Sequence, residues 1–82
     1  MQIEIYTKDY CPYCHRAKYL LDARGLKYTE YDVTYDREGQ QQMIDRTGGR
    51  TVPQIIIDGQ PIGGSDELVQ LDTAGLLDAA VT

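Results

Sequence analysis

The residues best able to do chemistry in this chain are two cysteines, Cys11 and Cys14, in the segment Cys11-Pro12-Tyr13-Cys14. They are the only cysteines among 82 residues. A disulfide between them would close too short a loop to constrain the unfolded chain much. Small secreted domains that rely on disulfides usually carry several, far apart in sequence. We therefore expect a redox-active disulfide that takes part in thiol-disulfide exchange.

The sequence after Cys11 predicts a helix that begins at the cysteines and ends at Gly25. Pro12 suits the first helical turn, where no backbone donor is needed. A helical repeat places four residues on one face, with Leu20 widening the apolar stripe: Cys14, Ala17, Lys18 and Leu21.

This position assigns different roles to the two thiols. The Cys11 sulfur would lie beside unpaired backbone N–H groups at the positive end of the helix dipole, which favours a thiolate able to attack disulfides. Cys14, one turn inside the helix, is expected to be more buried, nearer an ordinary thiol pKa, and suited to resolving a mixed disulfide. Lys8, three residues before Cys11, is a candidate positive charge near the thiolate, although it could equally be a solvated loop lysine.

A metal site is the competing interpretation, because Cys-x-x-Cys is also half of a zinc site. A closed site needs four ligands, and the neighbourhood adds only His15. His15 follows Cys14 directly, so on a helix it points in another direction. We expect no metal.

Before residue 50 the sequence also predicts two strands and a second helix. Alternation of Ile3 and Ile5 with polar residues indicates a first strand over residues 2–7. Residues 26–33 indicate a second, whose apolar residues fall on both parities, as in a sheet covered on both faces. Asp36 is a plausible N-cap for a helix to about Thr47.

The last third of the chain predicts a hairpin followed by helix. The apolar run 54–57 is followed by Asp58-Gly59 and a second arm, 60–62, in which Pro61 indicates an edge strand. Ser65 would cap a helix through Leu71, and residues 76–80 would form a last helical segment. The order is βαβαββα, and we expect one domain over residues 1–82.

The composition is typical of a small globular domain, with 41% apolar and 26% charged residues. The net charge of -5 argues against nucleic acid or an anionic membrane surface as partner. The first residues lack the basic flank and apolar run of a secretory signal, and no stretch approaches the roughly 20 apolar residues of a spanning helix. We expect a cytoplasmic protein.

Three motifs together resemble the glutaredoxin family. They are the segment 6–14 around the cysteines, the tripeptide Thr51-Val52-Pro53, and Gly63-Gly64-Ser65-Asp66. Their order and spacing are similar to those of dithiol (Cys-Pro-Tyr-Cys) glutaredoxins, closest to the small bacterial members. The resemblance implies an α/β, thioredoxin-like fold: a four-stranded mixed sheet flanked by three or more helices, with a cis peptide before Pro53. It also implies electron transport in cell redox homeostasis, by a chain expected to be a monomer.

The resemblance also implies a site for glutathione as co-substrate. The cysteinyl backbone of glutathione would pair with Val52 between Thr51 and Pro53, and its γ-glutamyl end would meet Gly64, the Ser65 backbone and the Asp66 carboxylate. Its glycyl carboxylate would lie near Lys8, Tyr13 and Gln40. Some family members carry Arg at the position of Gln40, and Arg37, one turn earlier, could substitute here.

Two positions separate this chain from relatives. Tyr10 stands where thioredoxins usually carry Trp before the first cysteine, which favours glutaredoxin over thioredoxin. Ser65 stands where many glutaredoxins have an additional cysteine, and this excludes a second disulfide within the chain.

By this resemblance Cys11 alone would reduce protein-glutathione mixed disulfides, and Cys11 with Cys14 would reduce protein disulfides. The partners would be glutathione and glutathionylated or disulfide-containing proteins. Three alternatives remain at this point: a redoxin reduced by a flavoprotein reductase, a pair of chains holding a [2Fe-2S] cluster through Cys11 and two glutathiones, and an inert domain with a structural disulfide. Pro12 tends in the family to accompany redox activity over cluster binding.

Overall fold

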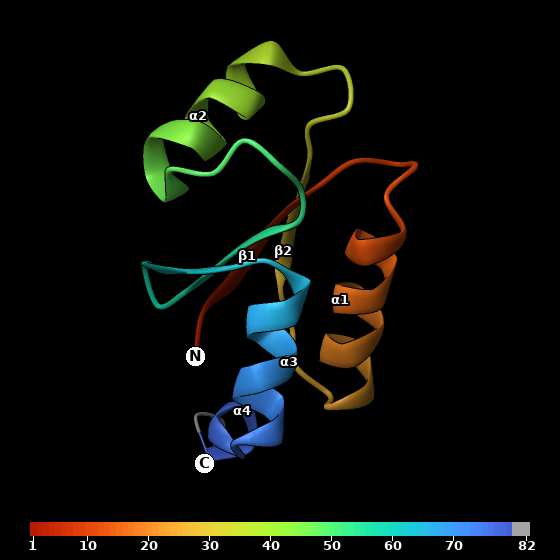
Figure 1. Cartoon of the computed structure of the whole chain (residues 1–82), viewed down its shortest axis with the longest axis vertical. Helices are drawn as coiled ribbons and strands as arrows, with labels where there is room; N and C mark the ends of the chain where they lie inside the picture. The colour runs from red at the N-terminus through yellow and green to blue at the C-terminus, as the bar shows by residue number, and fades with distance from the viewer. Residues whose placement is uncertain (80–82) are drawn as a thin grey trace.

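The structure, a computed structural model, describes residues 1–79 and contains one sheet with helices on both faces (Figure 1). In chain order the elements are β1 (Ile3–Thr7), α1 (Pro12–Ala23), β2 (Thr29–Asp32), α2 (Arg37–Thr47), β3 (Gln54–Ile57), β4 (Gln60–Gly63), α3 (Ser65–Thr73) and α4 (Leu76–Ala79). Within the described residues, no helix is long and apolar enough to cross a membrane.

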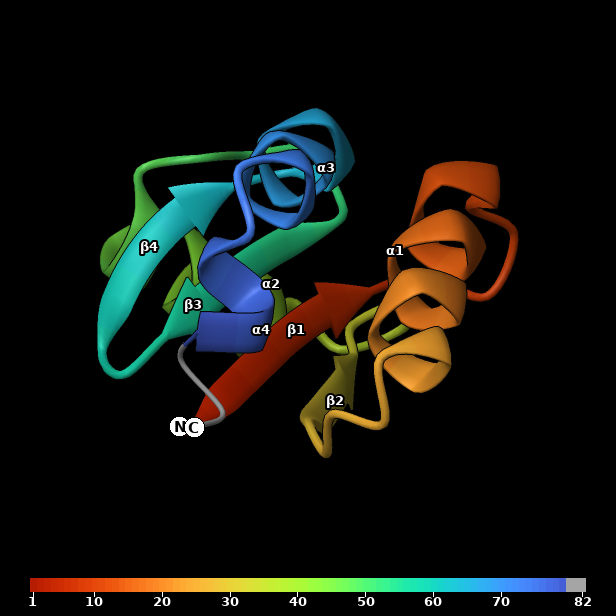
Figure 2. The same cartoon turned by 90° about the horizontal axis from the view of Figure 1, so that it is seen from below.

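The four strands lie in the order β2-β1-β3-β4. β1 and β2 are parallel, which requires the crossover that α1 provides, whereas β3 is antiparallel to both β1 and β4. Asp58 and Gly59 join β3 to β4 with φ values of 51° and 81°, the left-handed conformation of a tight hairpin turn. The sheet is therefore mixed, with β2 and β4 at its edges (Figure 2).

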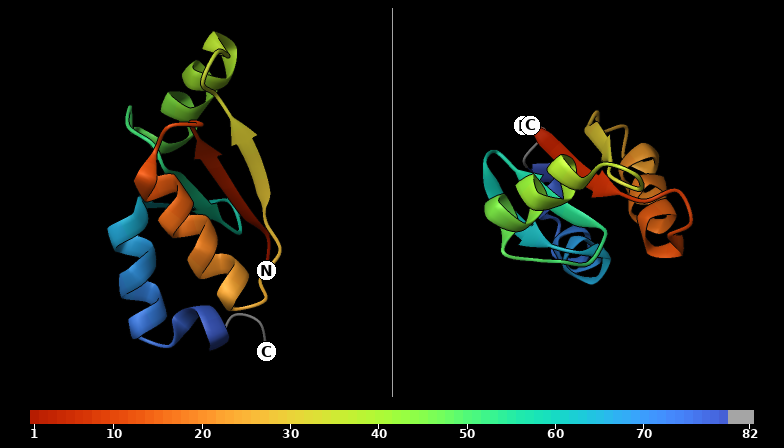
Figure 3. Two further views of the ribbon diagram at one scale, coloured as in Figure 1. Left: turned by 90° about the vertical axis from the view of Figure 1, so that its right-hand side faces the viewer. Right: turned by 90° about the horizontal axis from the view of Figure 1, so that it is seen from above.

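The alternation of side chains along β1 and β3 divides the core between the two faces of the sheet. Ile5 and Ile55 point to the face covered by α1 and α3. Tyr6 and Ile56 point to the other face, where they pack with Val33 and with Met43 of α2. Figure 3 shows α1 and α3 running side by side, with α2 set apart from them. The predicted coverage of both faces is confirmed.

The second strand is shorter than predicted. Only Thr29–Asp32 pairs with β1, in a parallel register that places Thr29 opposite Glu4 and Asp32 opposite Thr7. Residues 26–28 thus lie beyond most of β1. Leu26 and Tyr28 nevertheless pack against the α1 and α3 core, which explains their apolar character.

The predicted start of α2 is confirmed and that of α3 is wrong. The Asp36 carboxylate accepts a hydrogen bond from the Gly39 N–H at 2.9 Å, as an N-cap does. In α3, by contrast, Gly64 is the N-cap and Ser65 the first helical residue. The Glu67 carboxylate accepts the Gly64 N–H at 2.8 Å, so a side chain inside the helix caps it instead of Ser65.

The two C-terminal boundaries also differ slightly from expectation. α3 continues past Leu71 to Thr73. The last helical segment forms over Leu76–Ala79, and Ala80 lies outside the described residues. Pro61 lies in β4, an edge strand, as predicted.

Candidate active site

Cys11 is the N-cap of α1, with an extended backbone conformation and Pro12 in the first turn. Its Sγ accepts a hydrogen bond from the Cys14 N–H at 3.1 Å. The sulfur therefore occupies the place that a serine or aspartate oxygen usually takes at a helix start. Of the two cysteines, Cys11 is slightly exposed, at 8% of its surface, whereas Cys14 is fully buried.

Cys14 lies one turn inside α1, as predicted, but it is not an ordinary thiol. Burial and the hydrogen bond with Cys11 raise its pKa to about 12. At neutral pH the reduced protein therefore holds Cys14 as a thiol. Both cysteines are free.

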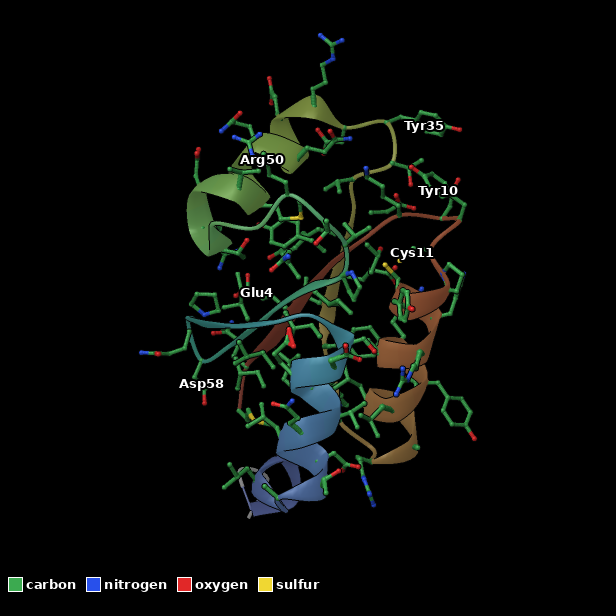
Figure 4. The ribbon with its side chains drawn as sticks, viewed as in Figure 1. Glu4, Tyr10, Cys11, Tyr35, Arg50 and Asp58 are labelled. Carbon is green, nitrogen blue, oxygen red and sulfur yellow. The ribbon has the colours of Figure 1, made fainter. Side chains whose placement is uncertain are left out.

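The loop before β3 lies against the first cysteine. The Cys11 thiol donates to the Val52 carbonyl oxygen at an S···O distance of 3.7 Å. The Val52–Pro53 peptide bond is cis, as expected from the Thr51-Val52-Pro53 tripeptide, and Pro53 is buried. Figure 4 shows Cys11 at the upper end of α1, below Tyr10.

An open groove of about 250 Å³ runs from the first turn of α1 past this loop to the start of α3. It is lined by Tyr13, Thr51, Val52, Pro53, Gln54, Gly63, Gly64, Ser65, Asp66 and Glu67. Three segments far apart in sequence thus form one surface. Of these residues, Gln54, Gly63 and Glu67 were missed as site residues. Gln54 and Glu67 resemble an ordinary strand residue and an acidic helix start, so no local signal marks them.

The α3 end of the groove combines helix-terminal donors with a carboxylate. Ser65 is buried, and its Oγ has no hydrogen-bond partner among the described residues. Asp66 is 78% exposed, and its Oδ1 lies 4.0 Å from Nη1 of Arg16 on α1. Free N–H groups at a helix N-terminus attract a carboxylate, while the Asp66 side chain attracts a cation. This end can therefore hold a group that carries both charges, such as an amino acid.

Four predicted site residues lie outside the lining of the groove: the two cysteines, Cys11 and Cys14, and two residues expected to bind glutathione, Lys8 and Gln40. The Lys8 carbonyl accepts the Cys11 N–H at 3.4 Å, which places Lys8 in the loop beside the first cysteine. The Gln40 side-chain amide donates to the Val33 carbonyl at 2.7 Å and so ties α2 to the end of β2. Arg37 is exposed in the first turn of α2. Between residues 1 and 79, no group of three or more His, Cys, Asp or Glu side chains is placed to hold a metal ion.

A Cys-x-x-Cys pair at the start of α1, beside a cis-proline loop on a four-stranded mixed sheet, defines a thioredoxin-like thiol-disulfide oxidoreductase. The glutaredoxin family model matches residues 3–62. The chain belongs to the glutaredoxin family.

Individual relatives agree with this assignment. Over 76 residues the chain is 51% identical to glutaredoxin 3 of Escherichia coli K12, covering 93% of this chain and 92% of that protein. It is 49% identical over 78 residues to a probable glutaredoxin of Synechocystis, covering 94% of this chain and 72% of the relative.

The fold comparisons identify the same family. A crystal structure of a buckwheat glutaredoxin-glutathione complex superimposes with a TM-score of 0.84 at 34% identity, covering 94% of this chain and 73% of that one. A dithiolic glutaredoxin of Trypanosoma brucei brucei also gives 0.84, at 35% identity and with 98% and 86% coverage.

Proposed function

We propose that this protein is a glutathione-dependent oxidoreductase that uses Cys11 alone on protein-glutathione mixed disulfides and Cys11 with Cys14 on protein disulfides. The observation that carries the proposal is that the Cys11 sulfur contacts a residue of the groove wall. Its sulfur caps α1 and lies 3.7 Å from the carbonyl of Val52, a residue of the groove wall. The glutathione-bound state of the buckwheat relative supports the same ligand class.

Different parts of the groove would contact different parts of glutathione. The γ-glutamyl α-carboxylate would accept from the N–H groups at the start of α3 and from the unpartnered Ser65 hydroxyl, and its ammonium group would face Asp66. The cysteinyl backbone would pair with Val52, which brings its sulfur toward Cys11. Tyr13, 60% exposed, is left to contact the glycyl end.

The glycyl carboxylate is the least constrained part of the ligand. Gln40 is engaged with Val33, and Lys8 lies outside the groove lining, so either residue would have to turn toward the ligand. We propose Lys8 as the principal contact, because an ammonium group attracts a carboxylate more strongly than an amide does. Arg37 is the second candidate.

In the proposed monothiol reaction, the Cys11 thiolate attacks the glutathione sulfur of a mixed disulfide. A Cys11–glutathione disulfide forms, the original S–S bond breaks, and the protein substrate leaves as a thiolate that takes up a proton. A second glutathione thiolate then attacks the glutathione sulfur on Cys11, which releases oxidised glutathione and restores the Cys11 thiolate.

In the proposed dithiol reaction, Cys11 forms a mixed disulfide with a protein substrate. Cys14 loses its proton and attacks the Cys11 sulfur, so the Cys11–Cys14 bond forms as the bond to the substrate breaks. Two glutathione molecules, which are together oxidised to their disulfide, later reduce the Cys11–Cys14 bond.

Two cysteine variants test these roles. Cys14→Ser is expected to keep turnover of a small glutathione mixed disulfide within about fivefold, because the monothiol reaction needs only Cys11. The same variant should lose reduction of a protein disulfide, and Cys11→Ser should lose both activities. The measurement is NADPH consumption coupled through glutathione reductase. Turnover by Cys11→Ser at the wild-type rate would overturn the assignment of the nucleophile.

Outcomes for the wild type decide among the wider alternatives. Rapid turnover that requires glutathione supports the proposal. Separately, we propose that the protein is a monomer that acts in the cytoplasm on glutathionylated or disulfide-containing proteins. Reduction of the protein by a flavoprotein reductase, without glutathione, would contradict the proposal and identify the protein as a glutathione-independent redoxin. A brown, dimeric protein after anaerobic purification would indicate a [2Fe-2S] carrier.

A further inference from the structure

A charged pair lies on the face of α1 that packs against the sheet. Cys14, Ala17 and Leu21 on this face are buried. Lys18 shares the face, and its side chain is only 24% exposed. Its Nζ lies 3.0 Å from Oε2 of Glu30 in β2. A charge within an apolar stripe costs desolvation energy, which a surface position would avoid.

Sheet register and a buried hydroxyl fix the position of Glu30. Glu30 lies opposite Ile5 in the parallel pair, and Ile5 belongs to the core under α1 and α3. The Thr7 hydroxyl, on the same face, donates to Glu30 Oε2 at 2.6 Å, and Thr7 is 1% exposed. Burial alone would raise the pKa of Glu30, but the bonds from Thr7 and Lys18 outweigh it and lower the pKa. The carboxylate therefore holds the ammonium group in place.

Lys18 follows Cys14 by four residues, which is one helical turn. Side chains at this spacing are neighbours, with Cβ atoms about 6 Å apart. The hydrogen bond with Glu30, followed by smaller effects that include Tyr28 and Cys14, raises the pKa of Lys18, so it stays an ammonium group.

Among the described residues, the titratable side chains that act on Cys14 are those of Cys11 and Lys18. Burial and Cys11 raise the pKa of the Cys14 thiol, whereas the backbone of Lys8 and the charge of Lys18 lower it. Lys18 therefore supplies a positive side chain that acts on this sulfur, while burial and Cys11 have the larger effects.

We propose that Lys18, held by Glu30, is a positioning residue that stabilises the negative charge on the Cys14 sulfur in the dithiol reaction. The proposal deepens the proposed function and rests on its assignment of Cys14 as resolving thiol. The charge develops as Cys14 attacks the Cys11 mixed disulfide, losing its proton to water while the substrate thiolate leaves. It returns when glutathione attacks Cys11 of the Cys11–Cys14 disulfide and Cys14 leaves as a thiolate. The monothiol reaction places no charge on Cys14.

The two thiol steps can be followed separately with Ellman's reagent, an aromatic disulfide. Cys11 attacks it and releases one coloured thiolate, and closure of the Cys11–Cys14 bond releases a second. In Lys18→Met the second phase is expected to slow about threefold to tenfold, with its pH profile moved to higher pH, while the first phase stays within about twofold. Because the reagent replaces glutathione, this result does not depend on whether glutathione is the physiological ligand.

Three matched variants complete the test. Lys18→Arg keeps the charge and should retain closure within about twofold, while Lys27→Met, at an exposed lysine, should leave both phases unchanged. In a Cys14→Ser background, Lys18→Met should not alter the first phase. If Lys18→Met does not fold, as judged by circular dichroism, Lys18→Gln takes its place. An unchanged second phase, or equal slowing of both phases, would overturn the proposal.

Discussion

The two faces of the sheet are built differently. Among the described residues, a cluster of eight buried apolar residues lies under α1 and α3, and the two cysteines lie at one end of α1. Under α2 the apolar cluster has four buried residues, and a network of charged and aromatic side chains lies beside it. The comparison shows that this chain places its reactive groups on the face with the larger buried apolar cluster, whose contacts hold α1 and hence the cysteines in position.

The α2 face relies on Arg46. Its guanidinium makes two hydrogen bonds to the Glu4 carboxylate, at 2.9 and 3.1 Å, and one to the Tyr6 hydroxyl at 2.9 Å. The Tyr31 hydroxyl donates to Glu4 at 2.8 Å, and the rings of Tyr6 and Tyr31 pack at a tilt of 36° with their centroids 4.9 Å apart. Glu4 is labelled in Figure 4, below α2. On this face, hydrogen-bonded polar groups lie beside an apolar core that is smaller than the core under α1 and α3.

The largest expected effect is a cavity in the α1 and α3 core. Leu21→Ala should lower the free energy of unfolding by about 3–5 kcal/mol, because Leu21 is fully buried in the larger cluster. Met43→Ala in the α2 cluster should cost less, about 2–3 kcal/mol. Urea unfolding of both variants measures this. A larger loss for Met43→Ala would contradict the comparison of the two faces.

An intermediate effect is expected in alkali on the face that carries the thiols. The pKa of Cys14 is about 12 in the fold, against an ordinary value of 9.0. The unfolded chain therefore loses this proton first, and stability present below pH 9 falls as pH rises toward 12. At pH 10 the reduced protein should have lost about 1–2 kcal/mol from this thiol.

Cys14→Ala is the control for the alkaline effect. Tyr28, Tyr31 and Lys18 also have raised pKa values, so they contribute to alkaline destabilisation in both proteins. The difference between wild type and variant in urea unfolding, followed from pH 8 to 11, isolates Cys14. If the two proteins lose stability in parallel, the thiol is not the source.

The smallest expected effect is on the α2 face. Arg46→Met should cost about 1 kcal/mol at pH 7, since the lost hydrogen bonds are partly exposed. The hydrogen bond from Arg46, with that from Tyr31, lowers the pKa of Glu4. Stability from this carboxylate is thus present above its ordinary value of 4.5 and is lost as pH falls through the lowered pKa. The deficit of Arg46→Met, measured by urea unfolding, should shrink in acid, with turnover at pH 7 unchanged.

Local features of the sequence sufficed to predict much of this fold. Alternation predicted β1, Asp36 predicted the start of α2, and Asp58-Gly59 predicted the hairpin, since each depends on residues close in sequence. The limits of β2 and the cap of α3 were not predicted correctly. β2 ends where β1 stops offering partners, and α3 is capped by a carboxylate that reaches back to Gly64, so both depend on groups outside the local pattern.

The sequence by itself determined the type of chemistry, because the spacing of Cys11 and Cys14 places one sulfur at a helix start and the other a turn inside it. Only the tertiary structure decided the surroundings of these sulfurs. It brought the Val52 carbonyl to Cys11, joined the loop before β3 to the start of α3 in one groove, and paired Glu30 of β2 with Lys18, one helical turn after Cys14. These contacts join strands and helices distant in sequence, and their geometry follows from sheet register and packing, which no local pattern specifies.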